Sequence, residues 1–393
     1  MVRKLILGSR DSILQELARI GVDKKSYPIF INKSDHLILK FENLSCAQTH
    51  ILKQTALICG ADLAIPKTAY QGGKGKKFSV LFFANKREIE KIEKKLDDQP
   101  WMEPIRQELQ NILAQRHLPV LELGRKKITI DRTYIMGVIN ITLDSFYGGS
   151  RYTTRAVLEK VAREMEEEGA DFIDIGAEST RPGACPIDEK EEIERLKLIL
   201  PKLAKMTHIP ISIDTRKTRV ASFAIDHGAT IVNDISGLGF DKKMAKVVAK
   251  NNVCLVIMHI KGSPKTMQLN PSYDDLMGEI HNFLEKKIDF ATQSGVKRER
   301  IIIDPGFGFG KRLDDNYEIM RRLNELTTFK RPILVGHSRK SFIGVPFNFT
   351  PEQRLEGTLG VEALLIKSGA SILRVHDVLE AKRVALLIDR IER

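Results

Sequence analysis

From Leu118 onward the chain alternates short apolar runs with longer stretches in which apolar residues recur at helical spacing. Continuous apolar runs of four to eight residues, as in this part of the chain, are typical of parallel strands that are buried on both faces. The stretches between them are typical of amphipathic helices, for example over Thr153–Glu168 and Lys190–Lys205. The predicted strands end at Asn140, Ile175, Asp214, Asp234, Met258, Asp304, Gly336 and His376.

Eight strand–helix units over residues 118–393 predict an α/β fold, a (β/α)8 TIM barrel, whose typical size is about 250 residues. A short hairpin, residues 120–123 with 127–130 around Gly124-Arg125, is expected to close the bottom of the barrel. A doubly wound open sheet would also alternate strands and helices. However, no Gly-x-Gly-x-x-Gly sequence follows the first strand, and eight similar units favour closure.

Residues 1–117 follow a different pattern, which predicts a small α+β domain of unknown role before the barrel. The basic loop Gln71–Lys77 in this part lacks the spacing of a Walker phosphate loop, so a solvated loop is favoured over a phosphate site. The expected strands are His36–Phe41 and Phe78–Ala84, and the expected helices are Leu44–Cys59, Lys86–Leu96 and Glu103–Gln115.

Composition is that of a soluble globular enzyme, with 42% hydrophobic and 29% charged residues among 393. The net charge of +12 would suit nucleic acid, a membrane surface or an anionic substrate, but no Lys/Arg block with interleaved aromatics occurs. No apolar stretch approaches the roughly 20 residues that cross a bilayer. The four cysteines lack paired spacing, which predicts a reducing cytoplasmic location without zinc or disulfides. We expect neither nucleic-acid nor membrane partners.

Polar residues at three neighbouring strand ends form the first candidate site, because barrel sites lie at the C-terminal ends of the strands. Asp214, Asn233 and Asp304 offer hydrogen-bond acceptors that would suit a flat heterocycle bearing amide and amine groups. Met258 would add a soft apolar face against the ring. A divalent metal site and structural capping are the alternatives.

Arg374 and His376 form the second candidate site, because residues two apart on one strand point to the same face. A guanidinium and an imidazole suit a phosphate or diphosphate, and the last strands of barrels commonly bind phosphate. Asn140, on the adjacent first strand, could add a phosphate or metal contact. Purely structural roles for the Arg and His remain the alternative.

The apolar run Pro332–Val335 leads directly into Gly336-His337-Ser338-Arg339-Lys340-Ser341. Cations such as Arg339 and Lys340 do not lie unpaired in a core, so they are expected to meet an anion or a polar ligand. The nearby sequence Gly306-Phe307-Gly308-Phe309-Gly310 is a weak phosphate motif. We interpret it as a tight turn that presents an aromatic ring.

Five motifs over residues 118–393 resemble the dihydropteroate synthase family. Together and in this order they are highly specific, and the first 117 residues resemble an extension found in some bacterial members. The motifs are Met136-Gly-Val-Ile-Asn-Ile-Thr-Leu-Asp-Ser-Phe146, Asp174-Ile-Gly-Ala-Glu-Ser-Thr-Arg-Pro-Gly183, Asp304-Pro-Gly-Phe-Gly-Phe-Gly-Lys311, Ser338-Arg-Lys-Ser-Phe-Ile-Gly344 and Arg374-Val-His-Asp377.

The resemblance implies a transferase of folate synthesis that joins 6-hydroxymethyl-7,8-dihydropterin diphosphate to 4-aminobenzoate and releases diphosphate. It also implies Mg²⁺ as cofactor, bound through Asn140, and a homodimer. It assigns catalytic roles to Asp144, Arg181 and Lys340; the pterin to Asp214, Asn233, Met258, Asp304 and Lys340; the diphosphate to Asn140, Arg374 and His376; and the aminobenzoate to Phe146, Thr180, Arg181, Pro182, Phe309 and Ser341.

The chain departs from the family pattern on the acceptor side. Leu143 replaces a Pro in the first loop, Tyr147-Gly148 replaces Ser-Asp, and Ala177 replaces a Gly in the second motif. These changes leave open another arylamine acceptor. A pterin-binding methyltransferase domain would not need the Ser338–Ser341 motif or the Arg374 and His376 pair, and a non-catalytic paralogue would be expected to lack Asp144 or Arg181.

Overall fold

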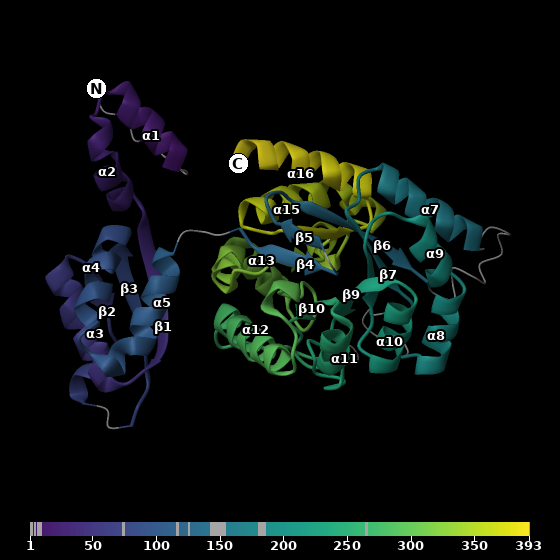
Figure 1. The fold of residues 1–393 in the computed structure, drawn as a ribbon, viewed down its shortest axis with the longest axis horizontal. Helices are drawn as coiled ribbons and strands as arrows, with labels where there is room; N and C mark the ends of the chain where they lie inside the picture. The colour runs from purple at the N-terminus through teal and green to yellow at the C-terminus, as the bar shows by residue number, and fades with distance from the viewer. Residues whose placement is uncertain are drawn as a thin grey trace. The chain divides into compact units, whose positions relative to one another are not determined.

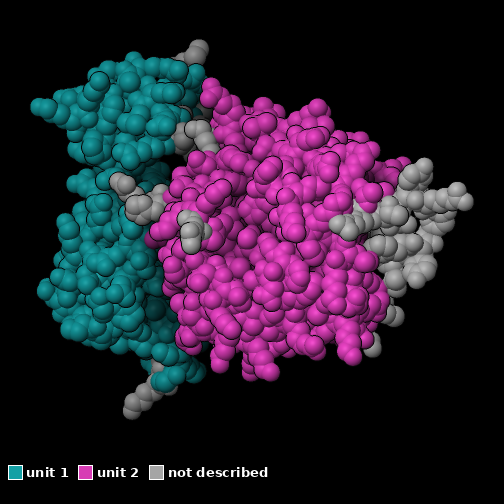
Figure 2. All heavy atoms as spheres, turned by 45° about the vertical axis from the view of Figure 1, so that its right-hand side comes forward, with its two compact units in different colours: residues 1–117 teal, residues 118–393 magenta. Residues whose placement is uncertain are grey.

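A computed structural model describes residues 3, 5, 10–72, 75–114, 118–124, 126–141, 155–179, 186–263 and 266–392. The chain divides into two compact units, Met1–His117 and Leu118–Arg393, which Figure 2 draws in different colours. Each unit has its own hydrophobic core. Each is therefore described by itself.

The first unit is a three-stranded antiparallel sheet in the order β1-β3-β2, with helices packed against it (Figure 1). Strand β3 alternates buried and exposed residues, which is the pattern of a sheet with one face on a core. Sequence analysis did not predict α1, α2 and β2. The elements are α1 (Arg10–Arg19), α2 (Tyr27–Ser34), β1 (His36–Leu44), α3 (Cys46–Cys59), β2 (Asp62–Ala64), β3 (Phe78–Asn85), α4 (Lys86–Leu96) and α5 (Glu103–Leu113).

The second unit contains the predicted barrel of eight parallel strands. Seven neighbouring pairs form the sheet β11-β10-β9-β8-β7-β6-β13-β12, and a parallel bridge between Ile303 and Ile333 joins its two ends. The strands are β6 (Tyr134–Asn140), β7 (Phe172–Gly176), β8 (Ile211–Asp214), β9 (Ala229–Asp234), β10 (Cys254–Met258), β11 (Ile301–Asp304), β12 (Leu334–Val335) and β13 (Ile372–Val375).

Helices cover the outside of the barrel (Figure 1), and the main core lies between them and the strands. The predicted helix Lys190–Lys205 is two helices, because Pro201 lies in a first turn, where its missing N–H costs no hydrogen bond. The helices are α7 (Arg155–Glu167), α8 (Glu189–Lys197), α9 (Leu200–Met206), α10 (Thr218–Asp226), α11 (Met244–Asn251), α12 (Leu276–Gln293), α13 (Leu313–Arg322), α14 (Ser341–Gly344), α15 (Leu355–Lys367) and α16 (Val378–Glu392).

The hairpin before the barrel consists of β4 (Val120–Leu123) and β5 (Lys126–Thr129), one residue earlier in its second strand than predicted. Leu121 and Leu123 of β4 belong to the same buried cluster as Met136, Phe172 and other residues from the first halves of the barrel strands. The hairpin therefore closes the N-terminal end of the barrel, as the sequence predicted.

Interior side chains change from apolar to polar along several strands of the barrel. Side chains two residues apart share a face, so Asp174 follows Phe172 inside the barrel, as Asp304 follows Ile302. The same step leads from buried Ile372 to Arg374. The fold thus places a polar layer above an apolar floor, at the C-terminal end where the loops begin.

Candidate active site

Arg374 forms the centre of the polar layer. Its Nε lies 2.6 Å from Asp174 Oδ2, and its Nη2 lies 2.9 Å from Asp214 Oδ2. Asn233 Nδ2 donates to the same Asp174 oxygen at 3.2 Å. Residues from β7, β8, β9 and β13 therefore form one hydrogen-bonded cluster inside the barrel.

Two carboxylates in this cluster share a single guanidinium. Burial raises the pKa of Asp214 above its usual range, and the neighbouring Asp174 carboxylate adds to that rise, although Arg374 opposes it. Asp174 is fully buried. Burial and the neighbouring carboxylate thus make ionisation of Asp214 less favourable than it is in water.

Three buried oxygens of the cluster accept no hydrogen bond within the described part of the chain: Oδ1 of Asp174, of Asp214 and of Asn233. Buried polar atoms nearly always have a partner, and an unpaired one costs roughly 1–3 kcal/mol. Three unpaired acceptors in one cluster therefore indicate a ligand that brings several N–H donors.

Lys340 follows β12 and reaches toward the same end of the barrel. Its Nζ donates to Phe307 O at 2.5 Å and lies 4.7 Å from the centre of the Phe309 ring. Burial lowers the pKa of Lys340 to about 8, while the carboxylates of Asp304 and Asp214 partly compensate. Lys340 is thus a cation beside a carboxylate and an aromatic face.

The glycine-rich turn after β11 depends on close backbone approach. Gly306 has φ +70°, and a Cβ there would lie 2.0 Å from His259 O; at Gly310, with φ +65°, it would lie 2.4 Å from Lys261 O. Only glycine fits either position. The turn presents the Phe307 carbonyl and the Phe309 ring to Lys340, as the sequence analysis expected of an aromatic-presenting turn.

Asp304 and Met258 complete the predicted pterin set at the ends of β11 and β10. Asp304 Oδ1 accepts from Gly306 N at 2.7 Å, and burial raises the pKa of its carboxyl group. Met258 is buried in an apolar cluster with Ile235 and Ile260, against which the partly buried Phe309 packs. The predicted acceptors and the apolar wall thus lie on adjoining strands.

Residues predicted for the diphosphate lie at the open end of the barrel. Asn140 and His376 are exposed there, and a Cβ added at Gly176 would lie between Asn140 Oδ1 and Asp214 Cβ, at 3.5 and 3.6 Å. His376 Nδ1 contacts Ser338 Oγ at 3.1 Å. Desolvation and the Arg374 cation lower the pKa of His376 to about 4, so its imidazole is mostly neutral at pH 7.

Arg339 meets an anion, as the sequence predicted, and that anion is the Asp377 carboxylate of the protein itself. Its Nε and Nη2 form a bidentate ion pair with Asp377, at 2.8 and 2.7 Å. Its backbone is left-handed, with φ +54°. The pair joins the loop after β12 to the loop after β13, and so supports Lys340.

Several predicted residues fall outside the described part of the chain. These residues belong to the loops after β6 and β7. They are Asp144, Phe146, Thr180, Arg181 and Pro182, together with the divergent Leu143. Of the residues predicted for the aminobenzoate, Ser341 is described, and it lies exposed at the first position of α14.

Sequence reasoning missed two buried charged residues at this end of the barrel, one in the cluster and one outside it. Asp174 was absent from the predicted set, although it is the one charged residue in the buried strand Phe172–Gly176. Lys311 is also buried, and its Nζ lies 3.0 Å from His259 Nδ1 and 3.1 Å from Phe309 O. A lysine that is 3% exposed could have been suspected only from its place directly after the glycine-rich turn.

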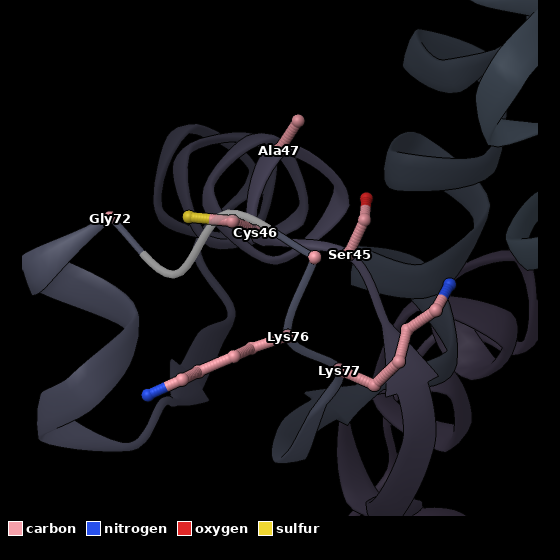
Figure 3. A pocket seen from close by; sticks show the side chains of 7 residues that line it. Ser45, Cys46, Ala47, Gly72, Lys76 and Lys77 are labelled. Carbon is pink, nitrogen blue, oxygen red and sulfur yellow. The ribbon is translucent and has the colours of Figure 1, made fainter.

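A separate pocket of about 410 Å³ lies in the first unit (Figure 3). The predicted solvated loop forms one side of it, and the start of α3 forms the other. In Figure 3 the long side chains of Lys76 and Lys77 extend in different directions from the same segment. The lining residues are Ser45, Cys46, Ala47, Gly72, Gly75, Lys76 and Lys77.

Comparison with known proteins places the barrel in a family. A family model described as pterin binding enzyme matches residues 136–376, which is more than half of the chain. The chain therefore belongs to the pterin-binding enzymes. Within them it shares the transferase activity of the dihydropteroate synthases in folate biosynthesis, as the following similarities show.

The dihydropteroate synthase of Clostridium beijerinckii is 44% identical over 275 residues, covering 70% of this chain and all of that protein. A Xanthomonas albilineans dihydropteroate synthase structure with 4-aminobenzoic acid has a TM-score of 0.65 and 37% identity, covering 70% of this chain and 98% of that one. A bifunctional dihydropteroate synthase/dihydropteroate reductase of Helicobacter pylori is 33% identical over 372 residues, covering 94% of this chain and 93% of that protein.

Proposed function

We propose that the polar cluster inside the barrel binds 6-hydroxymethyl-7,8-dihydropterin diphosphate and transfers its pterin-methyl group to 4-aminobenzoate. The three unpaired buried oxygens of Asp174, Asp214 and Asn233 carry this proposal. A pterin ring has the N–H and amino donors that these acceptors lack. The apolar side of Met258 then faces the ring.

The diphosphate is assigned to the open end of the barrel. Arg374 uses Nε and Nη2 for the two carboxylates, which leaves Nη1 without a carboxylate partner in the described ranges. Asn140 and His376 are exposed beside it. His376 can donate a hydrogen bond when neutral, and an approaching diphosphate would favour its protonated form.

Mg²⁺ fits this site only together with the substrate. No group of three His, Cys, Asp or Glu side chains suited to a metal occurs among the described residues. Mg²⁺ usually keeps several waters and uses one or two protein oxygens with substrate phosphates, which the exposed amide of Asn140 could provide. Bound there, Mg²⁺ would neutralise charge on the departing diphosphate.

The transfer needs little from the protein beyond charge and position. Breaking the C–O bond leaves positive charge on the pterin methylene and negative charge on the diphosphate. Arg374 stabilises the second charge, and the ring spreads the first. The neutral arylamine nitrogen then attacks the carbon and loses a proton, so no strong base is required. Asp144 and Arg181 remain predicted participants from the loops after β6 and β7.

A second activity is proposed for the first unit, reduction of the dihydropteroate product. The Helicobacter pylori relative named for both activities matches 94% of the chain, whereas the Clostridium protein matches only 70%. The reduction adds a hydride and a proton, so it needs a donor such as a reduced nicotinamide or flavin nucleotide. The pocket at Lys76 and Lys77 is a suitable size and charge for part of such a donor.

The surroundings of the enzyme remain predictions. None of the helices in the described ranges is long and apolar enough to span a membrane. Cys46, Cys59 and Cys254 are free thiols, which suits the predicted cytoplasmic location. The predicted homodimer would have apolar surface available on α16, where Leu386, Leu387 and Ile391 are exposed.

One assay tests both activities. The purified chain, given the pterin diphosphate, 4-aminobenzoate and Mg²⁺, should release one diphosphate for each dihydropteroate formed. Diphosphate release at the same rate without 4-aminobenzoate would contradict the acceptor. Adding a reduced nicotinamide or flavin nucleotide should then convert product to tetrahydropteroate; unchanged dihydropteroate with every such donor would remove the reductase proposal and leave the synthase intact.

A further inference from the structure

A buried group of charged side chains lies at the two ends of the connection between β7 and α8. Lys217, at the start of α10, is 5% exposed. Its Nζ lies 2.6 Å from Glu192 Oε2, 3.1 Å from Glu178 Oε2 and 2.7 Å from Ile187 O. An ammonium has three donors, so all three are used.

The contacts join both ends of one connection to the same ammonium. Glu178 follows β7 by two residues, and Ile187 precedes α8 by two. The two ends also contact each other, since Ile187 N donates to Glu178 Oε1 at 3.3 Å. Lys217, Glu178 and Glu192, here called the Lys217 group, therefore fix the positions of the first and last parts of the β7–α8 connection.

Two arginines also contact the first residues of the β7–α8 connection. Arg195 of α8 donates to Ala177 O at 2.8 Å. Arg216 Nη2 lies 3.4 Å from Glu178 Oε1, and its guanidinium stacks on the Phe240 ring at 4.6 Å. Two carboxylates thus face two cations, Lys217 and Arg216, in a mostly buried setting.

Burying these charged side chains costs desolvation free energy, so stability alone does not explain the arrangement. Glu192 is fully buried, and burial raises the pKa of its carboxyl group despite the adjacent Lys217. Replacing a buried ion group by apolar side chains is often neutral or stabilising. What the ion group adds is a fixed position for Glu178 and Ile187. In the sequence, Thr180, Arg181 and Pro182 lie between these two residues.

We propose that Lys217, Glu178 and Glu192 are positioning residues for the arylamine substrate. They touch no substrate themselves, and they act by fixing the two ends of the β7–α8 connection. This inference rests on the proposed function, because the substrate roles of Thr180, Arg181 and Pro182 do. Glu192 adds to the rise in the pKa of Asp214, whereas Glu178 forms its hydrogen bonds with Lys217, Arg216 and Ile187. The affinity for the pterin should therefore not depend on Glu178.

The test compares Glu178→Gln with Glu122→Gln. Glu122 forms a similar ion pair with buried Arg300, at 2.9 Å, in the closing hairpin at the other end of the barrel. Glu178→Gln should raise KM for 4-aminobenzoate about tenfold, because small misplacements of substrate-positioning groups have large effects. KM for the pterin diphosphate should stay within about twofold. Glu122→Gln should change neither KM.

Hydrogen exchange of the Ile187 amide gives a readout without turnover. Its exchange rate should rise about tenfold in Glu178→Gln, because the N–H loses a charged acceptor. If Glu178→Gln does not fold, Arg216→Gln, which removes the second cation that faces Glu178, takes its place. If exchange is faster in the variant but the wild-type protein does not use 4-aminobenzoate, the contacts of Lys217 stand and the proposed acceptor is wrong. Unchanged exchange, or equal KM changes for both substrates, would overturn the positioning role.

Discussion

Arg374→Met should unfold far more easily than the wild-type protein, with a loss of about 3–5 kcal/mol in the free energy of unfolding. The substitution keeps most of the side-chain volume but removes the charge shared by Asp174 and Asp214. Both carboxylates are then left in the barrel without a cation within hydrogen-bond distance. Urea denaturation measures the loss, and turnover should fall below detection.

The same variant should depend on pH in a defined direction. Burial raises the pKa of Asp214 and Arg374 opposes that rise, so losing Arg374 should raise the pKa of Asp214 further. A folded-state pKa above the unfolded value means that the folded protein binds more protons, so stability is present at low pH and is lost as pH rises. The gap between variant and wild type should therefore narrow from pH 7 to pH 5.

Arg132→Met is the matched control for burial. Arg132 pairs with Asp171 at 2.6 Å, but its side chain is 42% exposed and lies at the other end of β6. Exposed pairs contribute roughly 0–1 kcal/mol, so this variant should keep turnover and most of its stability. If the two variants lose equal amounts of unfolding free energy, the claim that Arg374 holds the buried cluster together is wrong.

Lys340→Ala should reduce turnover by about 100- to 1000-fold, the usual cost of removing a charged group that faces the reaction. Lys340 lies between the Phe307 carbonyl, the Phe309 ring and the carboxylate of Asp304. The fold should survive, because burial already disfavours this ammonium. Steady-state kinetics together with the melting temperature would separate the two effects. Turnover near the wild-type rate would remove Lys340 from the site.

The charge on Lys340 also predicts the alkaline limit of activity. Burial lowers the pKa of Lys340 to about 8, and the ammonium is the form below the pKa. Turnover of the wild-type protein should therefore decline as pH rises through about 8, well before an ordinary lysine would titrate. A rate that stays constant to pH 10 would show that the charge is not needed.

The barrel and its polar layer could be predicted from the sequence, because both follow from local patterns. Buried strands read as continuous apolar runs, and a side chain two residues beyond an apolar interior position shares its face. Asp214, Asn233, Asp304 and Arg374 were placed at the site in this way, and the structure brings them to one end of the barrel.

Contacts between distant residues could not be predicted in the same way. A diphosphate was the partner predicted for Arg374, with an unspecified structural role as the alternative, and the structure pairs it with Asp174, which precedes it by 200 residues. Nothing local in either strand specifies that partner. The Lys217 group was missed for the same reason, since its acceptors come from α8 and from the connection between β7 and α8.

In the first unit, the sequence pattern failed to predict three short or exposed elements, α1, α2 and β2. Helices α1 and α2 contain no buried residue, so burial on a core contributes little to them, although it is the main source of stability for most helices in proteins. Strand β2 has only three residues and one buried side chain, Leu63. Such elements depend on their neighbours more than on their own sequence.

Pterin binding to the unpaired acceptors is the central claim, and calorimetric titration of 6-hydroxymethyl-dihydropterin into wild type and Asp214→Asn tests it most directly. Asparagine can keep an oxygen toward Arg374 while its amide NH2 replaces the unpaired Oδ1. An acceptor then becomes a donor that opposes the donors of the pterin. We predict at least about 100-fold weaker binding in a folded variant. Equal affinity for the two proteins would contradict the assignment of the pterin to this cluster.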